Sequence, residues 1–355
     1  MTEIKNCPST FRHKRKDIIM LLYVDGPIVR TTNEEDEDWF FSQLEKGFKT
    51  KGRKRLTPES PLDYLSITIR TNKRGEVWIG NKEKTNEMLE KLETERINES
   101  WSGIARKDVE GTWDRITKDP DLTRGKYMPQ VTGMMGWLAN TVYPYMGTTS
   151  SVLGSMQRAN KEDSQKLTRM VSRLLQASKT YGLTRINDEG VKCQTDAGWA
   201  GERGQGSGPR QSRSGILITV NGMPVYWSSK RQGVIALPSA EAEMYAGGEA
   251  IKWLKHIVYL LEEIGIHTEK PYQIYSDSKA LIEFASSGGQ RTRMKHIDLR
   301  MGWIQDMTNE NELVLKYVKG SDNGADILTK FLSAYKTREW CDTYMTTEGE
   351  FMKRE

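Results

Sequence analysis

The chain has 355 residues, 28% of them charged and 36% hydrophobic, which is typical of a globular protein with two or three domains. It contains no run of about 18 apolar residues, which argues against a membrane span, and its first residues lack the apolar core of a secretory signal. Three cysteines form no zinc pattern and suit a reducing compartment, so we expect an intracellular protein of the cytoplasm or nucleus. The net charge of +5 is compatible with nucleic-acid binding but does not demonstrate it.

The N-terminal region, residues 1–80, combines short apolar runs with one acidic helix. The predicted elements are a strand pair over Asp17–Val29, a helix over Asn33–Phe48, and a hairpin formed by Leu65–Arg70 and Val77–Gly80. Gly26-Pro27 supplies the first turn, and Asn33 is the N-cap of a helix whose first turns are acidic, as the helix dipole favours. The basic run Lys49–Arg55 that follows fits a phosphate contact and a solvated loop equally well.

Residues 81–186 predict helices separated by a loose linker. Apolar residues at helical spacing mark Asn86–Leu92 and Ser164–Ser178 as helices. Gly182 is placed to end the second of them as its C′ residue. Between the two helices, about 94–124 is polar and interrupted by glycine and proline, which predicts a linker or insertion.

From residue 187 onward, strands alternate with helices. The predicted strands are Lys192–Ala200, Gly215–Asn221, Met223–Ser229, Gln273–Asp277 and Glu312–Val318, and the helices are a long one opened by Pro238–Tyr245, then Ala280–Ala285, Asp298–Asp306 and Asn323–Phe331. The dipeptide Asn221-Gly222 is a strong hairpin signal. Acids on a strand, on the long helix, at a strand end and on the last helix suggest one carboxylate cluster: Asp196, Glu241, Asp277 and Asp326. Residues past Ser333 are predicted to form a frayed or peripheral tail.

Five short motifs occur in an order that is specific in combination. They are Asp196–Gly201 (DAGWAG), Trp227–Gln232 (WSSKRQ), Ser239–Glu243 (SAEAE), Lys295–Asp298 (KHID) and Ala325–Lys330 (ADILTK). Together they resemble the ribonuclease H domain of Pol polyproteins from copia-type (Pseudoviridae-like) LTR retrotransposons, over roughly Val191–Leu332. The resemblance implies an α/β fold, with a mixed five-stranded sheet flanked by helices.

Earlier stretches resemble the reverse transcriptase of the same family. Tyr64–Ile69 is similar to a strand of the palm, and Tyr127–Thr141 is similar to the helical thumb and connection. The run Tyr23-Val24-Asp25-Gly26 resembles the Tyr-Val-Asp-Asp box, with glycine in place of the second acid. The implied domains are a partial palm (1–80), a thumb/connection (81–186), a ribonuclease H domain (187–335) and a tail (336–355).

The polymerase part is expected to be inactive. Polymerases of this type hold two magnesium ions with carboxylates from the box and from an earlier strand. The sequence begins only about twenty residues before the box, so that strand is missing. Because Gly26 removes a second ligand, Asp25 alone cannot assemble a two-metal site, and we expect DNA polymerase activity to be lost.

The reaction that the resemblance implies is Mg²⁺-dependent endonucleolytic hydrolysis of the RNA strand in RNA–DNA hybrids. In this pattern Asp196 bridges two Mg²⁺ ions, with Mn²⁺ able to substitute. Glu241 and Asp277 complete the shell of one ion, and Asp326 that of the other. Glu243, two positions along the helix from Glu241, points to a different side, and the family match favours Glu241.

Contacts to the hybrid would use 2′-hydroxyls on one strand and phosphates on the other. The candidates, which fit ordinary solvated turn residues equally well, are Ser228, Ser229, Lys230, Arg231 and Gln232. The loop Lys319–Asp322 lacks the histidine that bacterial and retroviral relatives carry there, and His296 is interpreted as structural or substrate-adjacent. The resemblance further implies the remainder of a Pol polyprotein as a partner, and a virus-like particle as the location if the element is active.

Two rival interpretations stay open. A decayed element would fold without catalysis and at most bind nucleic acid; Gly26 favours this interpretation, and the four surviving acids speak against it. A transposase or integrase shares the fold, but those enzymes place a glutamate last in an Asp-Asp-Glu order. Here Glu241 lies between Asp196 and Asp277, and the last acid is Asp326, which disfavours that class.

Overall fold

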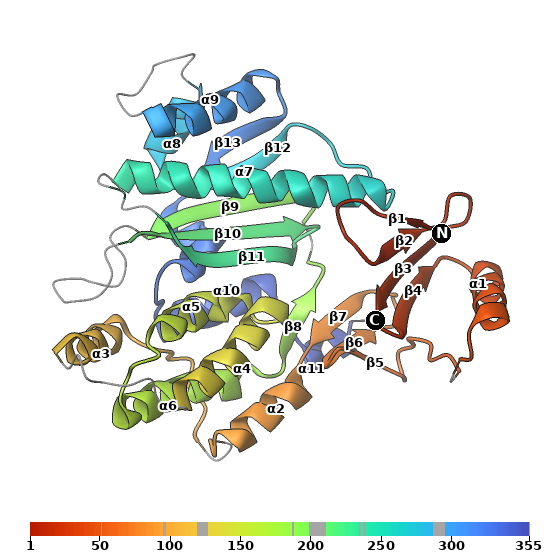
Figure 1. Ribbon diagram of the computed structural model, residues 1–355, viewed down its shortest axis with the longest axis horizontal. Helices are drawn as coiled ribbons and strands as arrows, with labels where there is room; N and C mark the ends of the chain where they lie inside the picture. Colours follow the sequence, from red (N-terminus) through yellow and green to blue (C-terminus); the bar gives the residue numbers. More distant parts are fainter. Residues whose placement is uncertain are drawn as a thin grey trace.

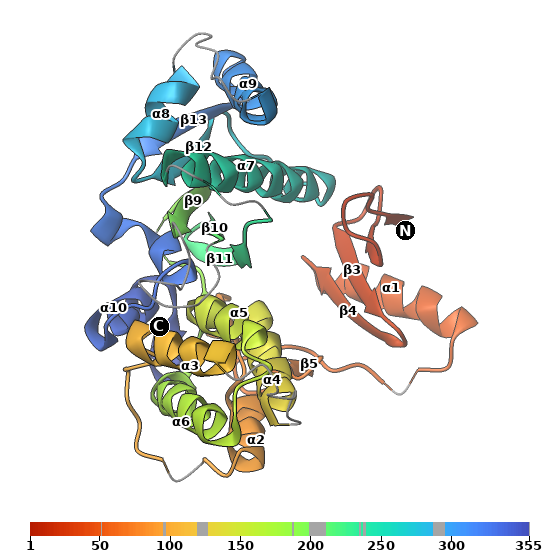
Figure 2. The same ribbon diagram turned by 60° about the vertical axis from the view of Figure 1, so that its left-hand side comes forward.

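A computed structural model describes residues 1–50, 52–94, 97–118, 127–186, 188–198, 211–233, 236, 239–286 and 295–354, and only the backbone of residues 127 and 295–301. The described strands form three sheets, one of four strands and two of five. Figure 1 shows the long helix α7 lying across one five-stranded sheet, with a group of helices below it and the N-terminal sheet to one side. In the turned view of Figure 2 the N-terminal sheet lies to one side, and Arg12 links it to the last residue of α7 by donating to the Glu263 carbonyl at 3.2 Å.

The N-terminal sheet is antiparallel, in the order β1-β2-β3-β4. Its elements are β1 (Thr2–Glu3), β2 (Thr10–Arg12), β3 (Ile18–Tyr23), β4 (Gly26–Thr31) and the following helix α1 (Glu34–Gly47). The turn predicted at Gly26-Pro27 is wrong, because Tyr23 pairs with Gly26 and the turn is made by Val24 and Asp25. Proline is tolerated in β4 because that strand lies at the sheet edge, where its missing N–H breaks no ladder on the outer side.

Helix α1 binds the basic segment that follows it. The predicted N-cap is confirmed, because the Asn33 side chain caps the first turn. Arg53 pairs with Asp38 at 2.8 Å, and Arg55 pairs with Glu34 at 2.8 Å. Pairs this exposed add little stability. They nevertheless show that the two arginines fold back onto the acidic helix. The phosphate contact considered for this run stays a prediction.

The second sheet joins distant parts of the chain, in the order β14-β8-β7-β6-β5. Its strands are β5 (Leu62–Tyr64), β6 (Ile67–Thr71), β7 (Val77–Gly80), β8 (Tyr181–Thr184) and β14 (Thr346–Thr347). Strands β6 and β7 form the predicted hairpin. The single strand predicted over Tyr64–Ile69 is wrong, because Leu65 and Ser66 turn the chain with φ angles of 52° and 62°. The strands of this sheet come from three of the four predicted domains, 1–80, 81–186 and 336–355. The boundaries of those domains stay a prediction.

Gly182 lies within this sheet, so the prediction that it ends a helix as a C′ residue is wrong. A Cβ atom at Gly182 would lie 2.3 Å from the Trp78 ring and 2.6 Å from the carbonyl oxygen of Ile79. The Trp78 side chain is 1% exposed, and its indole N–H donates to the carbonyl oxygen of Thr346 at 2.9 Å. Glycine is therefore needed here to make room for the tryptophan that ties β7 to β14.

The helices of the middle region pack around a large apolar core. They are α2 (Lys82–Lys91), α3 (Arg106–Lys118), α4 (Tyr127–Thr141), η1 (Pro144–Met146), α5 (Gly147–Ser155) and α6 (Lys161–Ser178). The loose linker predicted at about 94–124 is wrong over α3, where Val109, Thr112 and Ile116 are buried at helical spacing. The α3 residue Asp108 also pairs with Lys166 of α6 at 2.8 Å, so this helix belongs to the packed structure.

The third sheet is mixed, in the order β11-β10-β9-β12-β13. Its strands are β9 (Val191–Gly198), β10 (Arg213–Val220), β11 (Met223–Arg231), β12 (Tyr272–Ser276) and β13 (Leu313–Tyr317), and the helices around it are α7 (Ser239–Glu263), α8 (Lys279–Ser286) and α9 (Lys295–Asn309). The first three strands are antiparallel, while β12 and β13 run parallel to β9. Asn221 and Gly222 make the predicted hairpin turn with φ angles of 50° and 79°. This architecture confirms the predicted fold class. Across the described ranges, no helix is long and apolar enough to cross a membrane.

The segment past Ser333 is folded and packed, so the prediction of a frayed tail is wrong. It contains α10 (Ala334–Tyr344), β14 and α11 (Glu348–Met352). Trp340, Cys341 and Phe351 are buried. Burial of three large or apolar side chains explains why this segment is ordered against the core rather than solvated.

The segment predicted as the last core helix, Asn323–Phe331, is a short 3₁₀ turn, η3 (Gly324–Leu328), preceded by another, η2 (Gly320–Asp322). Hydrogen bonds at Gly324 hold η3 from two sides. Its N–H donates to Gln194 Oε1 at 2.6 Å, and its carbonyl oxygen accepts from the Trp340 indole at 2.9 Å. The Tyr344 hydroxyl donates to the same Gln194 oxygen at 3.0 Å. Helix α10 thus fixes η3 against β9.

Replacing Gly182 with alanine is expected to lower Tm, because the added methyl group would overlap the Trp78 ring and the Ile79 carbonyl. Overpacking of this kind costs about 1–3 kcal/mol, which circular dichroism during heating would detect. Gly154→Ala is the matched control: nothing lies within 4 Å of the added Cβ, and alanine favours the helix. Equal Tm values for the two variants would contradict the packing described.

Candidate metal centre

Asp196 lies on the central strand β9, directly opposite Gly215 of β10. A Cβ atom at Gly215 would lie 2.7 Å from the Thr329 side chain and 2.8 Å from the carbonyl oxygen of Ala325. Only glycine allows the η3 segment to approach the sheet this closely. The close approach brings the residues after η3 over Asp196.

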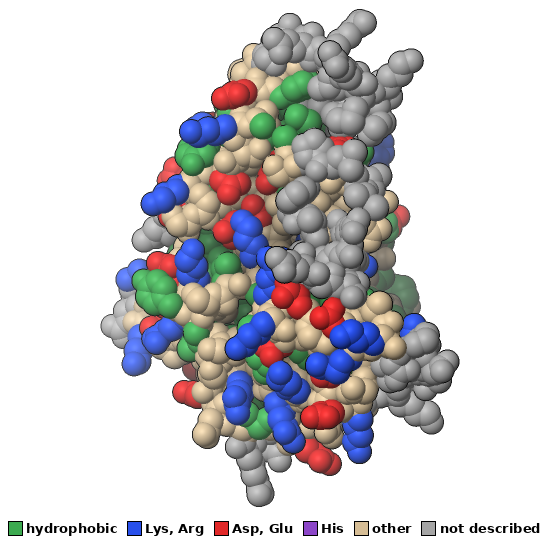
Figure 3. Space-filling view, turned by 90° about the vertical axis from the view of Figure 1, so that its left-hand side faces the viewer, with side chains coloured by type: hydrophobic (Ala, Val, Ile, Leu, Met, Phe, Trp, Pro, Cys, Tyr) green, Lys and Arg blue, Asp and Glu red, His purple; other side chains and the backbone are tan. Residues whose placement is uncertain are grey.

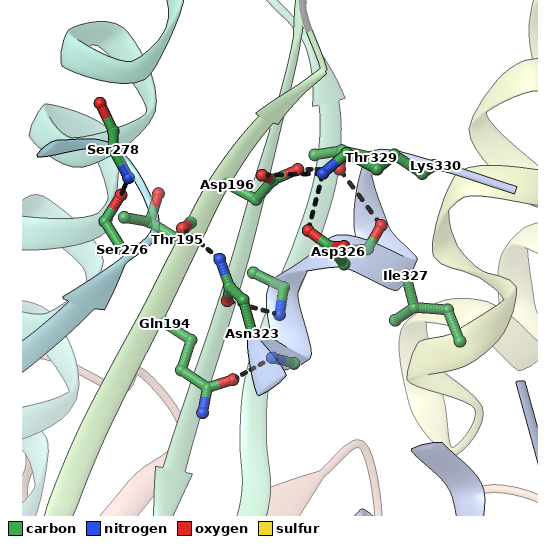
Figure 4. Close-up of polar contacts among 12 residues, drawn as sticks. Gln194, Thr195, Asp196, Ser276, Ser278, Asn323, Asp326, Ile327, Thr329 and Lys330 are labelled. Carbon is green, nitrogen blue, oxygen red and sulfur yellow. Dashed lines mark hydrogen bonds and ion pairs between the residues drawn. The ribbon is translucent and has the colours of Figure 1, made fainter. Parts of the chain in front are cut away.

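Both carboxylate oxygens of Asp196, which is 1% exposed, are engaged by two consecutive residues. The Thr329 hydroxyl donates to Oδ2, and Lys330 Nζ lies 3.3 Å from Oδ1. The same ammonium nitrogen lies 2.8 Å from Asp326 Oδ1. Lys330 therefore bridges the two carboxylates, as Figure 4 shows.

Glu243 and Asp277 extend the acidic group on the other side of Asp196. One carboxylate oxygen from each of the three residues lies within 4.8 Å of the others. Glu243 comes from the start of α7, and Asp277 directly follows β12. Gly247, one turn after Glu243, packs against Leu281 of α8, so this face of α7 approaches the segment that begins at Asp277.

Crowding and burial change the protonation of these side chains. Burial raises the pKa of Glu243 to about 8, and the charges of Asp196 and Asp277 add to that rise. Burial and then Asp196 raise the pKa of Asp277. The same two causes raise the pKa of Asp326 to about 6, although Lys330 opposes them. Burial disfavours the charged form of Lys330, but Asp196 and Asp326 outweigh it and raise the pKa of the ammonium.

The donor set fits a hard divalent cation. Carboxylate oxygens are the ligands that Mg²⁺ prefers, and the three clustered oxygens belong to Asp196, Glu243 and Asp277. Glu243 Oε2 is buried, and the described residues give it no hydrogen-bond partner. A buried, unpartnered carboxylate oxygen is costly, and a cation held by the group would remove that cost. Asp326 lies on the other side of Asp196 and could supply a further carboxylate oxygen.

The geometry favours Glu243 over Glu241, whose role as a ligand stays a prediction. Within the described residues the metal-type group contains Glu243, whereas Glu241 is 6% exposed and lies outside the group. Two positions along a helix differ by about 200° in direction, so only one of the two glutamates can face Asp196. The signal that sequence reasoning missed is Gly247, since a glycine four residues on marks the face where another element comes close.

The loop Lys319–Asp322, which carries no histidine, is close to the acidic group. A Cβ atom at Gly320 of η2 would lie 2.9 Å from Asp277 Oδ2, so this loop lies directly beside the carboxylate. His296 is in α9, but its side chain lies outside the described residues, and the interpretation made for it stays a prediction. The same holds for residues 199–201 of the first motif.

The candidate hybrid contacts divide into internal and exposed side chains. Gln232 is buried and donates to Ser214 Oγ at 3.0 Å and to the Ala242 carbonyl at 2.9 Å, so the competing interpretation of it as a solvated turn residue is wrong. Ser229 lies 3.3 Å from the Arg213 guanidinium inside the fold. Lys230 is exposed, whereas Ser228 and Arg231 are half-buried. On the face in Figure 3, acidic side chains gather near mid-height, and Lys and Arg side chains are dense below them.

The residues of the polymerase-like box lie at the tip of the β3–β4 hairpin. Tyr23 is 57% and Val24 82% exposed, and Asp25 is exposed as well. The Gly26 carbonyl accepts from the Tyr64 hydroxyl at 3.1 Å. In the described part of the chain, Asp25 belongs to no group of clustered acids that could hold a metal.

Comparison with curated proteins points to transposons. The chain is 25% identical over 325 residues to the retrovirus-related Pol polyprotein from transposon TNT 1-94 of Nicotiana tabacum, covering 90% of this chain and 24% of the relative. It is 29% identical over 219 residues to that from transposon RE2 of Arabidopsis thaliana, covering 61% and 14%. A shorter match, 42% over 89 residues, is to the secreted RxLR effector protein 161 of Plasmopara viticola, covering 24% of this chain and 60% of the effector. No protein-family model matches.

This chain is a homologue of transposon Pol polyproteins. The resemblance stated from its motifs is thereby confirmed, and the chain spans less than a quarter of the length of the Pol relatives named above. Among solved structures, LC11-RNase H1, isolated from compost by a metagenomic approach, matches with a TM-score of 0.31 and 21% identity, over 41% of this Pol homologue and 94% of that chain. The foamy viral protease-reverse transcriptase in complex with double-stranded DNA matches with a TM-score of 0.47 and 13% identity, over 84% and 46%.

The raised pKa of Glu243 predicts a pH-dependent stability in EDTA. Because the folded protein keeps a proton on Glu243 that the unfolded chain releases above its ordinary value of 4.5, the free energy of unfolding falls as pH rises from about 4.5 to 8. Glu243→Gln removes this titration, so the variant should gain Tm over the parent at pH 8 and lose most of that gain at pH 5. Exposed Glu283→Gln is the control and should show no such trend. A pH-independent difference for Glu243→Gln would refute the assignment.

Proposed function

We propose that this chain is the ribonuclease H part of a transposon Pol protein and hydrolyses the RNA strand of RNA–DNA hybrids endonucleolytically with Mg²⁺. The observation that carries this proposal is the group of Asp196, Glu243 and Asp277, whose oxygens lie within 4.8 Å on a mixed five-stranded sheet. Its setting in a chain homologous to Pol polyproteins supports nucleic acid as the substrate class.

The position of each acidic side chain suggests which of two Mg²⁺ ions it would bind. Two Mg²⁺ ions, when bound, would activate a water and stabilise the leaving oxygen of the phosphodiester. Asp196, on the central strand, lies between the other acids and would be shared by both ions. Glu243 and Asp277 would serve one ion from α7 and the end of β12. Asp326 would serve the other ion, because its carboxylate lies close enough to that of Asp196 for Lys330 to pair with both.

Hybrid contacts would come from exposed basic side chains rather than from Gln232. Lys230 on β11 is exposed. A wider basic surface is available on the helical region, where the exposed basic residues of α3 and α6 are Arg106, Lys107, Arg115, Lys118, Lys161, Lys166, Arg169 and Arg173. Phosphates bind such surfaces mainly by charge, so this region could position the duplex while β9 and α7 present the acids. The remainder of a Pol polyprotein is proposed as a covalent or assembled partner.

The second candidate function is that of a folded remnant that binds nucleic acid without cutting it. The observation that favours it is the exposed hairpin tip, where Gly26 replaces an acid and Asp25 lies outside any described acidic group. The polymerase part of the chain fits this description. The ribonuclease part does not, because its acids are assembled.

Hydrolysis of an end-labelled hybrid, with Mg²⁺ and with EDTA, separates the two functions. The chain should cut the RNA strand only with Mg²⁺, and Asp196→Asn and Glu243→Gln should each lower the rate at least about 100-fold, since each removes a ligand charge that stabilises the transition state. Asp322→Asn, at an exposed position on η2, should keep the parent rate. Unchanged turnover in Glu243→Gln, with loss in Glu241→Gln, would return the role to Glu241.

Primer extension tests the polymerase-like segment separately. The purified chain should not extend a primer on an RNA or DNA template, and Gly26→Asp should not create this activity, because Asp25 has no clustered acid among the described residues. A control polymerase on the same template shows that the assay works. Measurable extension before or after the substitution would contradict the inactive assignment.

A further inference from the structure

Lys330 occupies a position inside the acidic centre that a metal ligand set does not require. Its Nζ lies 2.8 Å from Asp326 Oδ1 and 3.3 Å from Asp196 Oδ1. The two carboxylates belong to opposite elements, β9 and η3, and the ammonium is the positive charge between them (Figure 4). A cation in this place is held by the same two oxygens that would bind a metal ion.

The exposure of the three side chains indicates that this pairing is reversible. The Lys330 side chain is 45% exposed, against 2% for Asp196 and 16% for Asp326. The lysine therefore reaches in from the surface, and its flexible four-carbon stem can swing out without repacking the core. The carboxylates cannot move in the same way, because they lie on a central strand and on a turn fixed by α10.

The backbone next to Lys330 keeps the ammonium close. The N–H of Lys330 donates to the Asp326 carbonyl at 2.9 Å, and the Thr329 hydroxyl donates to the other oxygen of Asp196. The effective concentration of the lysine beside the acids is consequently high. The ammonium is also attracted by two carboxylates at once, since it lies within 3.3 Å of both Asp196 and Asp326.

We propose that Lys330 is a tethered cation that holds the Asp196–Asp326 side of the centre until a divalent cation displaces it into solvent. The side made by Asp196, Glu243 and Asp277 has an unpartnered oxygen and is open to a first ion. The Asp196–Asp326 side must first lose its lysine, so it fills at higher concentration. The inference rests on the proposed function only in its requirement for a divalent centre, and it does not depend on hydrolysis.

Titration calorimetry with Mn²⁺ and the full chain, without nucleic acid, tests the proposal directly. Lys330→Met removes the charge while keeping the length of the side chain, so the weaker Mn²⁺ binding step should tighten on the order of tenfold, as loss of a close competing charge predicts. In EDTA the same variant should have a lower Tm than the parent, and Mn²⁺ should close that gap. Lys336→Met, at an exposed lysine on α10, is the matched control and should change neither quantity.

Lys330→Arg retains the charge and should keep both the Tm in EDTA and the weaker binding of the parent. Unchanged or weaker Mn²⁺ binding by Lys330→Met would overturn the displacement while leaving the metal centre intact. Failure of the parent and both variants to bind Mn²⁺ would overturn the metal centre and this inference together. Binding that tightens as expected in a chain that cuts no hybrid would support the inference and reject the hydrolysis.

A measurement on the unmodified chain covers the case in which Lys330→Met does not fold. Acetic anhydride labels lysines that are free of ion pairs, and mass spectrometry reports the extent at each position. Labelling of Lys330 relative to Lys336 should rise severalfold when Mg²⁺ is added, because the ammonium leaves its two carboxylates. A ratio that stays constant or falls with Mg²⁺ would overturn the proposal.

Discussion

Four carboxylates share one partly buried centre, and their mutual repulsion is the constraint on which the surrounding structure depends. Burial raises the pKa of each of the three acids around Asp196, and the charge of Asp196 adds to the rise. A group of this kind separates unless its backbones are fixed. The fold fixes them by placing each acid on a different element, so that no single element can relax to move them apart.

The weakest of these elements is η3, because a five-residue 3₁₀ turn has little stability of its own. Its position comes from neighbours on both sides. Gly215 lets it lie close to the sheet, and the Gln194 side chain and the Trp340 indole bind the two polar groups of Gly324. The location of Asp326 is therefore decided by residues that carry no charge.

The sequence predicts those parts of the structure that depend on local patterns. The Asn221-Gly222 turn, the Asn33 cap and the long helix α7 each depend on residues within one or two turns of one another, and each was predicted correctly. The order along the chain of the strands in the third sheet followed from periodicity and motif order.

The features that the sequence does not reveal share a different physical cause, because each depends on what lies across from the residue. Glu243 faces the centre rather than Glu241 because of how α7 is rotated against β9, and rotation is set by packing. The local sequence predicts that Gly182 ends a helix, and only the Trp78 ring opposite it shows why glycine is required there. The packed segment past Ser333 and the helix α3 are rich in charged residues, and only their few buried side chains reveal that they belong to the core.

The hydrogen bond from the Trp78 indole to Thr346 joins positions 268 residues apart. It closes a sheet whose strands come from the palm-like, connecting and C-terminal segments, and α10 of the last segment supports η3. Segments on both sides of residues 187–335 therefore contribute to the packing around the nuclease-like part. A fragment limited to residues 187–335 would retain the acids but lose most of α10, the helix that holds η3 and Asp326 in place.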